Sequence, residues 1–232
     1  MKLEVLNLKK KFEKKEVLKG INFTFESGKI YGLLGRNGAG KTTFFNCLND
    51  DIQPDEGIFN MIEKENTRPL TTDDIGYVLS TPTVPEFLTG REFLKFFLEI
   101  NEGKIKDVKT IDEYFDFMKI EKEDRDKLLK DYSHGMKNKM QMLINIIANP
   151  NILLLDEPLT SLDVVVAEEM KEMLKSIKKD HILIFSTHIM DLALSLCDEI
   201  VVLKNGTLSL VDSKLKGEKL KEKIIEMLRE DE

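Results

Sequence analysis

The sequence is poor in cysteine, has no long hydrophobic run and carries no long block of Lys or Arg. Its two cysteines, Cys47 and Cys197, lie in separate apolar patterns without a CxxC spacing. We therefore expect small buried side chains and a reducing compartment, not a metal site or a disulfide. No stretch approaches the roughly 18 apolar residues of a membrane span, and the first residues lack a hydrophobic signal core. We expect any role at a membrane to depend on a partner.

Basic residues are scattered through the chain, and the formal net charge is −7. Such a chain has no broad positive field that would attract a nucleic-acid backbone, so we expect no nucleic-acid partner. The 232 residues are 41% hydrophobic, enough to bury a sizeable core, and they show no internal repeat. A chain of this length exceeds one ordinary domain but is too short for two. We therefore expect a single domain that spans residues 1–232 and contains an inserted subdomain.

Short apolar strands alternate with helical patterns towards both ends of the sequence. Such alternation predicts a largely parallel sheet covered by helices. Asn205-Gly206 predicts a hairpin turn, and the mixed-charge segment 216–232 predicts a helical tail. We expect strands over 3–8, 17–25, 30–34, 57–62, 74–79, 152–155 and 182–185, and helices over 42–48, 164–178 and 189–196.

The segment over about 83–149 differs from both ends because helical spacing dominates it from Thr89 onward. Proline interrupts regular elements, and it marks the edges of this segment at Pro82 and Pro85 on one side and at Pro150 on the other. The pattern predicts a helical subdomain inserted in an α/β core.

A glycine-rich loop follows the predicted strand over 30–34. It fits the pattern GxxxxGK followed by Ser or Thr, between a strand and a helix as the pattern requires. Glycines let the backbone curl so that successive N–H groups face phosphate oxygens, and the helix adds its positive end. Lys41 would reach the β- and γ-phosphates, and Thr42 would bind Mg²⁺. The residues expected to bind nucleotide here are Gly35, Arg36, Asn37, Gly38, Ala39, Gly40, Lys41, Thr42 and Thr43.

Two carboxylates end the apolar strand predicted over 152–155. Open α/β folds bind ligands at the carboxyl ends of parallel strands, which puts Asp156 where it could hold the Mg²⁺ shell. Glu157, one residue further, could polarise a water for in-line attack on a γ-phosphate. The phosphate loop alone allows a GTPase, a kinase or an ATPase, and the acidic pair alone could begin a surface loop. Together the two motifs favour nucleotide hydrolysis.

Further motifs resemble the ATP-binding cassette (ABC) family, in the family's order across essentially the whole chain. Tyr132-Ser133-His134-Gly135-Met136 occupies the place of the family signature LSGGQ, and Ser161-Leu162-Asp163 follows Glu157 as the family's D-loop does. His188 matches the family's switch histidine, and Phe12 sits where the family has an aromatic residue that stacks on adenine. Each of these motifs is weak evidence when taken alone, so the resemblance rests on their occurrence together in the family's order.

The resemblance implies an α/β fold of the P-loop NTPase type, with a mixed sheet core, a small antiparallel β subdomain and the helical insertion. It also implies an ATPase that uses ATP and Mg²⁺ and dimerises on ATP. The phosphate loop of one subunit would face Ser133 and Gly135 of the other. In this arrangement Lys41, Glu157 and His188 are catalytic, and His188 reaches the γ-phosphate and orients Glu157.

Two positions depart from the family pattern. Ser80 stands where the family has a glutamine that reaches the Mg²⁺, and the shorter serine could contact the metal shell only through a bridging water. His134 replaces the first signature glycine. Ser133 could still donate its hydroxyl, and Gly135 its backbone N–H at the start of a helix over 136–148. Two hypotheses follow: catalysis is intact, or the chain is the degenerate ATP-binding half of a heterodimer.

The expected partner is a separate integral-membrane permease, which would hold the chain at the cytoplasmic face of the membrane. The family receives a permease helix in the stretch after Ser80, so we expect an exposed apolar patch near Phe87.

The compact chain is similar to subunits of exporters. The alternative is a non-transport ABC ATPase acting on ribosomes or DNA, but those typically carry a second cassette or a long coiled coil. Four apolar side chains are expected mostly to pack inside the helical insertion: Phe93, Phe96, Phe97 and Ile100.

Overall fold

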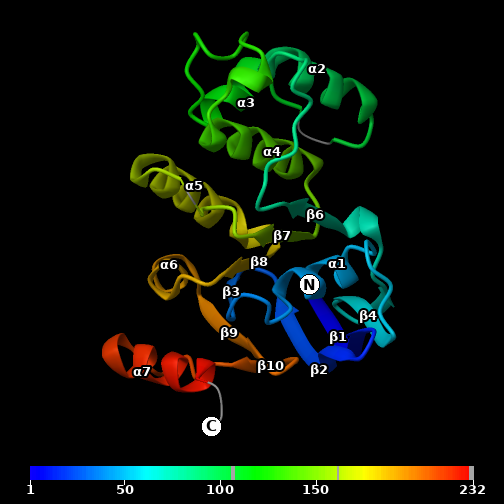
Figure 1. Cartoon of the computed structure of the whole chain (residues 1–232). Helices are drawn as coiled ribbons and strands as arrows, with labels where there is room; N and C mark the ends of the chain where they lie inside the picture. Colours follow the sequence, from blue (N-terminus) through cyan, green and yellow to red (C-terminus); the bar gives the residue numbers. More distant parts are fainter. Residues whose placement is uncertain (106–107, 161, 230–232) are drawn as a thin grey trace.

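The computed structural model describes residues 1–105, 108–160 and 162–229, which form two sheets with helices around them (Figure 1). The strands of the larger sheet are β3 (Ile30–Leu34), β6 (Ile75–Val78), β7 (Ile152–Asp156), β8 (Ile182–Thr187), β9 (Glu199–Lys204) and β10 (Thr207–Leu210). Their order is β10-β9-β3-β8-β7-β6. Neighbouring strands are parallel except β9 and β10, which form the hairpin expected at Asn205-Gly206. The prediction of a largely parallel sheet is confirmed.

The smaller sheet is antiparallel. Its strands are β1 (Lys2–Phe12), β2 (Lys15–Glu26), β4 (Glu56–Glu63) and β5 (Asn66–Pro69), in the order β2-β1-β4-β5. The sequence pattern did not predict β5, which is short, lacks apolar alternation and ends on a proline. It becomes a strand because a tight turn folds it back on β4. With this sheet and the helical part, the expected P-loop α/β fold class is confirmed.

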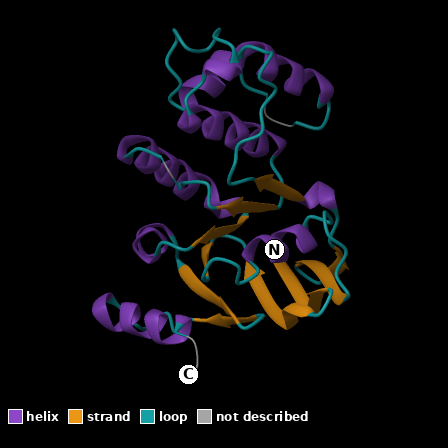
Figure 2. Ribbon diagram, in the orientation of Figure 1, coloured by secondary structure: helices purple, strands orange, loops and turns teal. Residues whose placement is uncertain are grey.

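The helices lie in groups around the sheets (Figure 2). They are α1 (Lys41–Leu48), α2 (Gly90–Ile100), α3 (Ile111–Phe117), α4 (His134–Ala148), α5 (Val164–Ile177), α6 (Met190–Leu196) and α7 (Gly217–Leu228), with 3-10 turns at Thr72–Asp74, Leu129–Asp131 and Lys178–Asp180. The helices α2, α3 and α4 gather at one end of the molecule, beyond β6 and β7. Among the described residues, no helix has both the length and the apolar character needed to cross a membrane.

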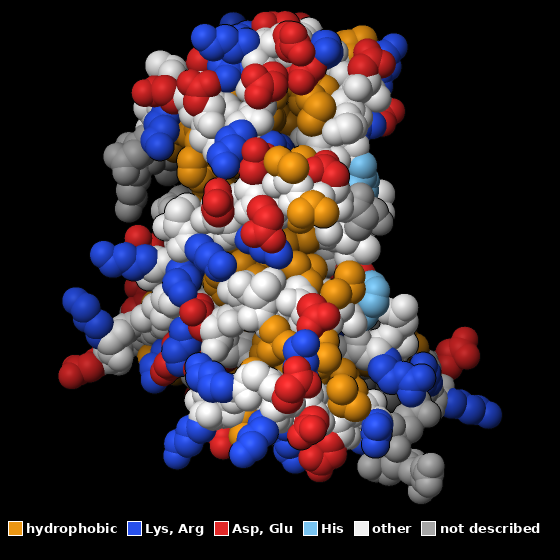
Figure 3. Space-filling model, turned by 90° about the vertical axis from the view of Figure 1, so that its left-hand side faces the viewer, with side chains coloured by type: hydrophobic (Ala, Val, Ile, Leu, Met, Phe, Trp, Pro, Cys, Tyr) orange, Lys and Arg blue, Asp and Glu red, His pale blue; other side chains and the backbone are white. Residues whose placement is uncertain are grey.

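One side of the molecule is occupied in turn by α5, α6 and α7 (Figure 1). The space-filling view of that side shows acidic and basic side chains interspersed with apolar ones, with no continuous block of positive charge on this face (Figure 3).

The larger sheet separates two apolar clusters, because successive side chains of a strand point to opposite faces. Leu153 and Leu155 of β7 pack with side chains of α2 to α5. Ile152 and Leu154 pack on the other face with α1 and the smaller sheet, in a cluster that also buries Cys47. Burial on both faces explains why β7 reads as a continuous apolar run and not as an alternation.

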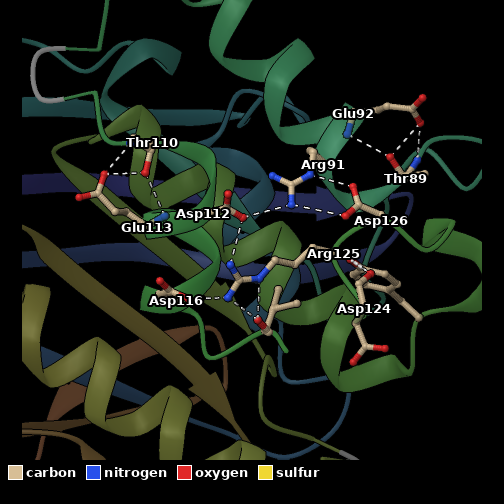
Figure 4. Close-up of polar contacts among 12 residues, drawn as sticks. Thr89, Arg91, Glu92, Thr110, Asp112, Glu113, Asp116, Asp124, Arg125 and Asp126 are labelled. Carbon is tan, nitrogen blue, oxygen red and sulfur yellow. Dashed lines mark hydrogen bonds and ion pairs between the residues drawn. The ribbon is translucent and has the colours of Figure 1, made fainter. Parts of the chain in front are cut away.

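A chain of ion pairs connects α2, α3 and the segment before α4 (Figure 4). Arg91 of α2 donates to Asp126 at 2.7 Å and to Asp112 at 3.1 Å. Arg125, only 4% exposed, donates to the same Asp112 at 3.1 Å and to Asp116. A guanidinium keeps its charge when buried and can bind several oxygens at once, so these contacts fix α2 and α3 relative to each other.

Two boundaries in the helical insertion correct the sequence expectation. Helix α4 begins at His134 and not at Met136, because the Ser133 hydroxyl accepts a hydrogen bond from the Met136 N–H at 3.2 Å and caps the helix. Residues 118–128 form turns and irregular backbone, with an isolated bridge from Leu128 to Thr89, instead of continuing the helical pattern. Lys119 has a left-handed backbone with a φ of 51°, which ends α3.

The apolar side chains of α2 divide between its two faces. Phe93 and Phe97 pack in the core of the insertion, as expected. The expectation is wrong for Phe96 and Ile100, which are 53% and 60% exposed. These two residues lie one turn apart on the outer side of α2, which nothing in the described chain covers. Phe87, before the helix, is 80% exposed, as expected.

The buried carboxylate of Asp74 joins the two sheets. Arg68 of β5 donates to both of its oxygens at 2.6 Å, and Asn151, just before β7, donates at 2.6 Å. The Arg68 guanidinium holds the pKa of Asp74 well below its usual range. A carboxylate whose folded-state pKa is lowered stabilises the fold above the unfolded pKa of about 4, and this stabilisation is lost as the pH falls.

Asp74→Asn is expected to lower the free energy of unfolding by about 2 kcal/mol at pH 7, because it removes the carboxylate that accepts two hydrogen bonds from Arg68 and leaves only the more distant Glu63, at 3.6 Å. The difference from the wild type should shrink below about pH 4, where the unfolded wild-type chain takes up the proton. Urea unfolding at pH 7 and pH 3.5 measures both effects. The control is Asp73→Asn, an exposed neighbour in the same turn. An equal loss of unfolding free energy in both variants would show that the contact between Asp74 and Arg68 does not stabilise the fold.

Candidate active site

The glycines of the phosphate loop hold a conformation that other residues would strain. Gly38 and Gly40 have left-handed backbones, with φ of 78° and 107°. A Cβ at Gly40 would also lie 2.8 Å from Cγ1 of Val17 on β2. The loop joins β3 to α1, which begins at Lys41. The free N–H groups at the start of α1 therefore lie at the end of the loop, as an anion site requires.

Lys41 is buried, at 6% exposure, between the phosphate loop and the end of β7. Its ammonium donates to the carbonyl of Gly35 at 2.9 Å and lies 3.7 Å from a carboxylate oxygen of Glu157. Burial lowers the pKa of Lys41, and the carboxylates of Glu157 and Asp156 oppose that shift. The cation is placed to meet a phosphate held between the loop and β7.

Asp156 ends β7, and both of its carboxylate oxygens accept hydrogen bonds. The Thr42 hydroxyl donates to one oxygen at 2.8 Å, and the Ser186 hydroxyl of β8 donates to the other at 2.5 Å. These contacts fix the carboxylate beside a hydroxyl. Hard oxygen donors of this kind suit Mg²⁺, which proteins commonly hold with one or two side chains together with substrate phosphates. Thr42 and Asp156 therefore fit the metal.

Glu157 turns its side chain away from the direction of β7. Its backbone is left-handed, with a φ of 49°, and its N–H donates to the carbonyl of Ser186 at 3.2 Å. A non-glycine residue in this region is strained, and such strain is common at functional sites. The turn brings the Glu157 carboxylate to 3.0 Å from Nδ1 of His188, which follows β8. The pair predicted from the sequence is thus in contact.

Ten of the predicted residues line one cleft with a volume of about 430 Å³, and His188 reaches it through its contact with Glu157. Phe12, at the end of β1, is 44% exposed, so its ring is not part of the core. Lys15 and Val17 of β2 also line the cleft. No local sequence motif marks these two residues or Ser186, because strand pairing brings all three to the site. The expected residues that line the cleft are Phe12, Asn37, Gly38, Gly40, Lys41, Thr42, Thr43, Ser80, Asp156 and Glu157.

Three residues of the phosphate loop do not line this cleft. Arg36 and Ala39 line a neighbouring cavity of about 450 Å³. Gly35 lies against β9, where a Cβ would stand 2.9 Å from the carbonyl oxygen of Leu203. At this position the close approach of two backbones requires glycine.

The chain does not bring Ser133 and Gly135 to its own cleft. Both lie at the start of α4 in the helical insertion. Asp163 caps α5, since its carboxylate accepts from the N–H groups of Val165 and Val166 at 3.0 Å. Ser161, the first residue of the predicted D-loop motif, lies outside the described residues.

The model of the ABC transporter family matches residues 18–160. The chain is 32% identical over 209 residues to the uncharacterized ABC transporter ATP-binding protein YxlF of Bacillus subtilis (strain 168), covering 89% of this chain and 69% of that protein. It is 32% identical over 211 residues to the bacitracin transport ATP-binding protein BcrA of Enterococcus faecalis, covering 89% and 67%. Its fold is similar to the dimeric structure of a post-hydrolysis state of the ATP-binding cassette MJ0796 bound to ADP and Pi, with a TM-score of 0.73, 21% identity and coverage of 89% and 96%. The chain therefore belongs to the ABC transporter family, as an ATP-binding subunit with ATPase activity.

Proposed function

We propose that this chain pairs with a second nucleotide-binding chain around ATP, hydrolyses it with Mg²⁺ and so drives transport through a separate integral-membrane permease. The observation that carries the proposal is the single cleft in which Lys41, Thr42, Asp156 and Glu157 meet, with His188 in contact with Glu157. The cation, the two residues suited to Mg²⁺, the carboxylate that would activate water and the histidine beside it are all present, although Ser80 replaces the family's glutamine. We therefore propose a catalytically active subunit and not a degenerate half.

The phosphate loop and Lys41 would bind the β- and γ-phosphates, and the exposed ring of Phe12 would stack on the adenine. Thr42 and Asp156 would hold Mg²⁺ directly, and Ser80 would reach it through a water. Bound Mg²⁺ supplies positive charge that neutralises the phosphate oxygens as the bond to the γ-phosphate breaks. Lys41 adds its cation to the same oxygens.

Glu157 is the group that would accept a proton from the attacking water, and His188 would hold its carboxylate towards the cleft. The strained backbone at Glu157 supports this role, because it aims the side chain at the place where a γ-phosphate would lie beside Lys41. His188 would also contact the γ-phosphate.

The other half of each site would come from the second chain. Ser133 and Gly135 lie at the N-terminal end of a fifteen-residue helix, whose free N–H groups and positive dipole end suit a phosphate. A single chain leaves them away from its own cleft. The cassette MJ0796, similar in fold, is dimeric, which supports a two-chain site.

We propose docking of the permease on the surface around Phe87, because this side chain is 80% exposed and follows Ser80 of the cleft closely in the chain. Phe87→Glu is expected to reduce ATP-driven transport at least about tenfold, because a desolvated carboxylate opposes apolar docking. ATP binding to the isolated chain should stay within about twofold of the wild type. Transport into membrane vesicles and nucleotide titration measure the two quantities.

The matched control is Ile58→Glu, an equally non-conservative change at a side chain of β4 that is 60% exposed. It should leave transport unchanged. Transport by the Phe87 variant at the level of the Ile58 variant would rule out docking at this surface.

We also propose that the chain acts at the cytoplasmic face of the membrane as part of an exporter. The similarity to BcrA, a bacitracin transport protein, supports a role in transport. Purification of the native complex from membranes, with identification of its permease and a transport assay, tests the direction and gives the cargo.

A further inference from the structure

The N-terminal ends of α4 and α5 lie against each other. A Cβ at Gly135 of α4 would stand 3.3 Å from Cγ1 of Val166 of α5, so glycine allows this close approach. Ser133 caps α4, and Asp163 caps α5 at the same end. Val164, next to Asp163, is 79% exposed. We call the residues Ser133, Gly135, Asp163 and Val164 the paired-end surface.

A partly buried ion pair connects the same two helices one turn further along. Lys139 lies four residues after Gly135, and Glu169 lies three residues after Val166. Their side chains are 2.7 Å apart, and Lys139 is 6% exposed. The Lys139 ammonium also donates to the carbonyl of Lys119, just after α3, at 3.2 Å. A buried cation must be paired to be tolerated, so Lys139 anchors α4 to both neighbours.

Apolar packing at this junction is incomplete beside the pair. A cavity of about 200 Å³ opens there, lined by Phe117, Met170 and Met173 together with Lys139 and Glu169 themselves. The pocket is open to solvent, so it marks the outer edge of the junction between α4 and α5. At this edge the ion pair links α4 and α5 directly, beside the apolar cluster that both helices share.

We propose that Lys139 and Glu169 are a positioning pair that fixes α4 against α5, and thereby fixes the paired-end surface offered to nucleotide on a second chain. This inference rests on the proposed function, because the paired-end surface acts only across the interface between two chains. Neither residue touches the cleft of its own chain. Loss of the pair would let Ser133 move relative to Asp163, while α1, β7 and β8 would keep that cleft unchanged.

The test uses Glu157→Gln as the parent, in which ATP is bound but not hydrolysed. Lys139→Met is expected to weaken Mg-ATP-driven dimerisation by about tenfold or more, measured by sedimentation of the full chain over a range of concentrations. The affinity of the single chain for a fluorescent ATP analogue should stay within about twofold, because that affinity depends on its own cleft. Lys139→Arg, which keeps the charge, should restore dimerisation.

Glu169→Gln provides a second variant should Lys139→Met fold poorly, and it should weaken dimerisation in the same way. Lys119→Met is the matched control, because Lys119 contacts the same Glu169 at 4.0 Å from a side chain that is 53% exposed. Unchanged dimerisation in both variants of the pair would overturn the proposal, as would a parallel loss of single-chain nucleotide affinity. A parent that stays monomeric with Mg-ATP would instead refute the two-chain function itself.

Discussion

Glu157→Gln is expected to lower ATP turnover by about 100- to 1,000-fold, because the amide cannot take a proton from the attacking water. Glutamine has nearly the same shape, so the left-handed backbone and the contact with His188 can persist. Lys41 and Thr42 are unchanged. The substitution also removes one negative charge from a cleft that receives phosphates, so ATP should bind at least as tightly as to the wild type.

Phosphate release from Mg-ATP and equilibrium nucleotide titration measure the two effects separately. The matched control is Glu65→Gln, the same chemical change in the exposed turn between β4 and β5. This variant should keep wild-type turnover. A Glu157→Gln variant that turns over ATP within about threefold of the wild type would show that another group activates the water.

The cleft was predictable because its main residues belong to two local motifs. A strand, a glycine-rich turn and a helix place Lys41 and Thr42 together whatever the rest of the chain does. The apolar run before Asp156 predicts a strand buried on both faces, and the carboxyl end of such a strand is where ligands bind. The contact between Thr42 and Asp156 confirms that the two motifs meet.

Features that depend on contacts between distant segments were not predictable. Ser186 is an ordinary strand residue until the pairing of β7 with β8 brings it to Asp156. The burial of Lys139 depends on Glu169, thirty positions away. Likewise, helical spacing shows that Phe96 and Ile100 could share a face of α2, but not whether that face is covered. Sequence periodicity predicts which residues share a face of a helix, but it does not predict which other element packs against that face.

Turnover per chain is expected to rise with chain concentration and then reach a plateau. Each chain offers one cleft with Glu157 and one α4 end with Ser133, and the two lie apart in the same chain. Under the proposed function, a complete site therefore needs two chains. In dilute solution the fraction of paired chains grows with concentration, so activity per chain should grow with it. A constant activity per chain would point to a site completed within one chain.

Mixing two inactive variants tests this two-chain site most directly. Glu157→Gln removes the catalytic carboxylate, and Ser133→Asp keeps a good helix cap but sets a negative charge where a phosphate would bind. When the two variants pair at random, half of the pairs in an equal mixture are mixed, and each mixed pair holds one complete site. Turnover should recover to about a quarter of the wild-type value. A mixture that stays as inactive as its separate components, while the wild type hydrolyses ATP under the same conditions, would contradict the account.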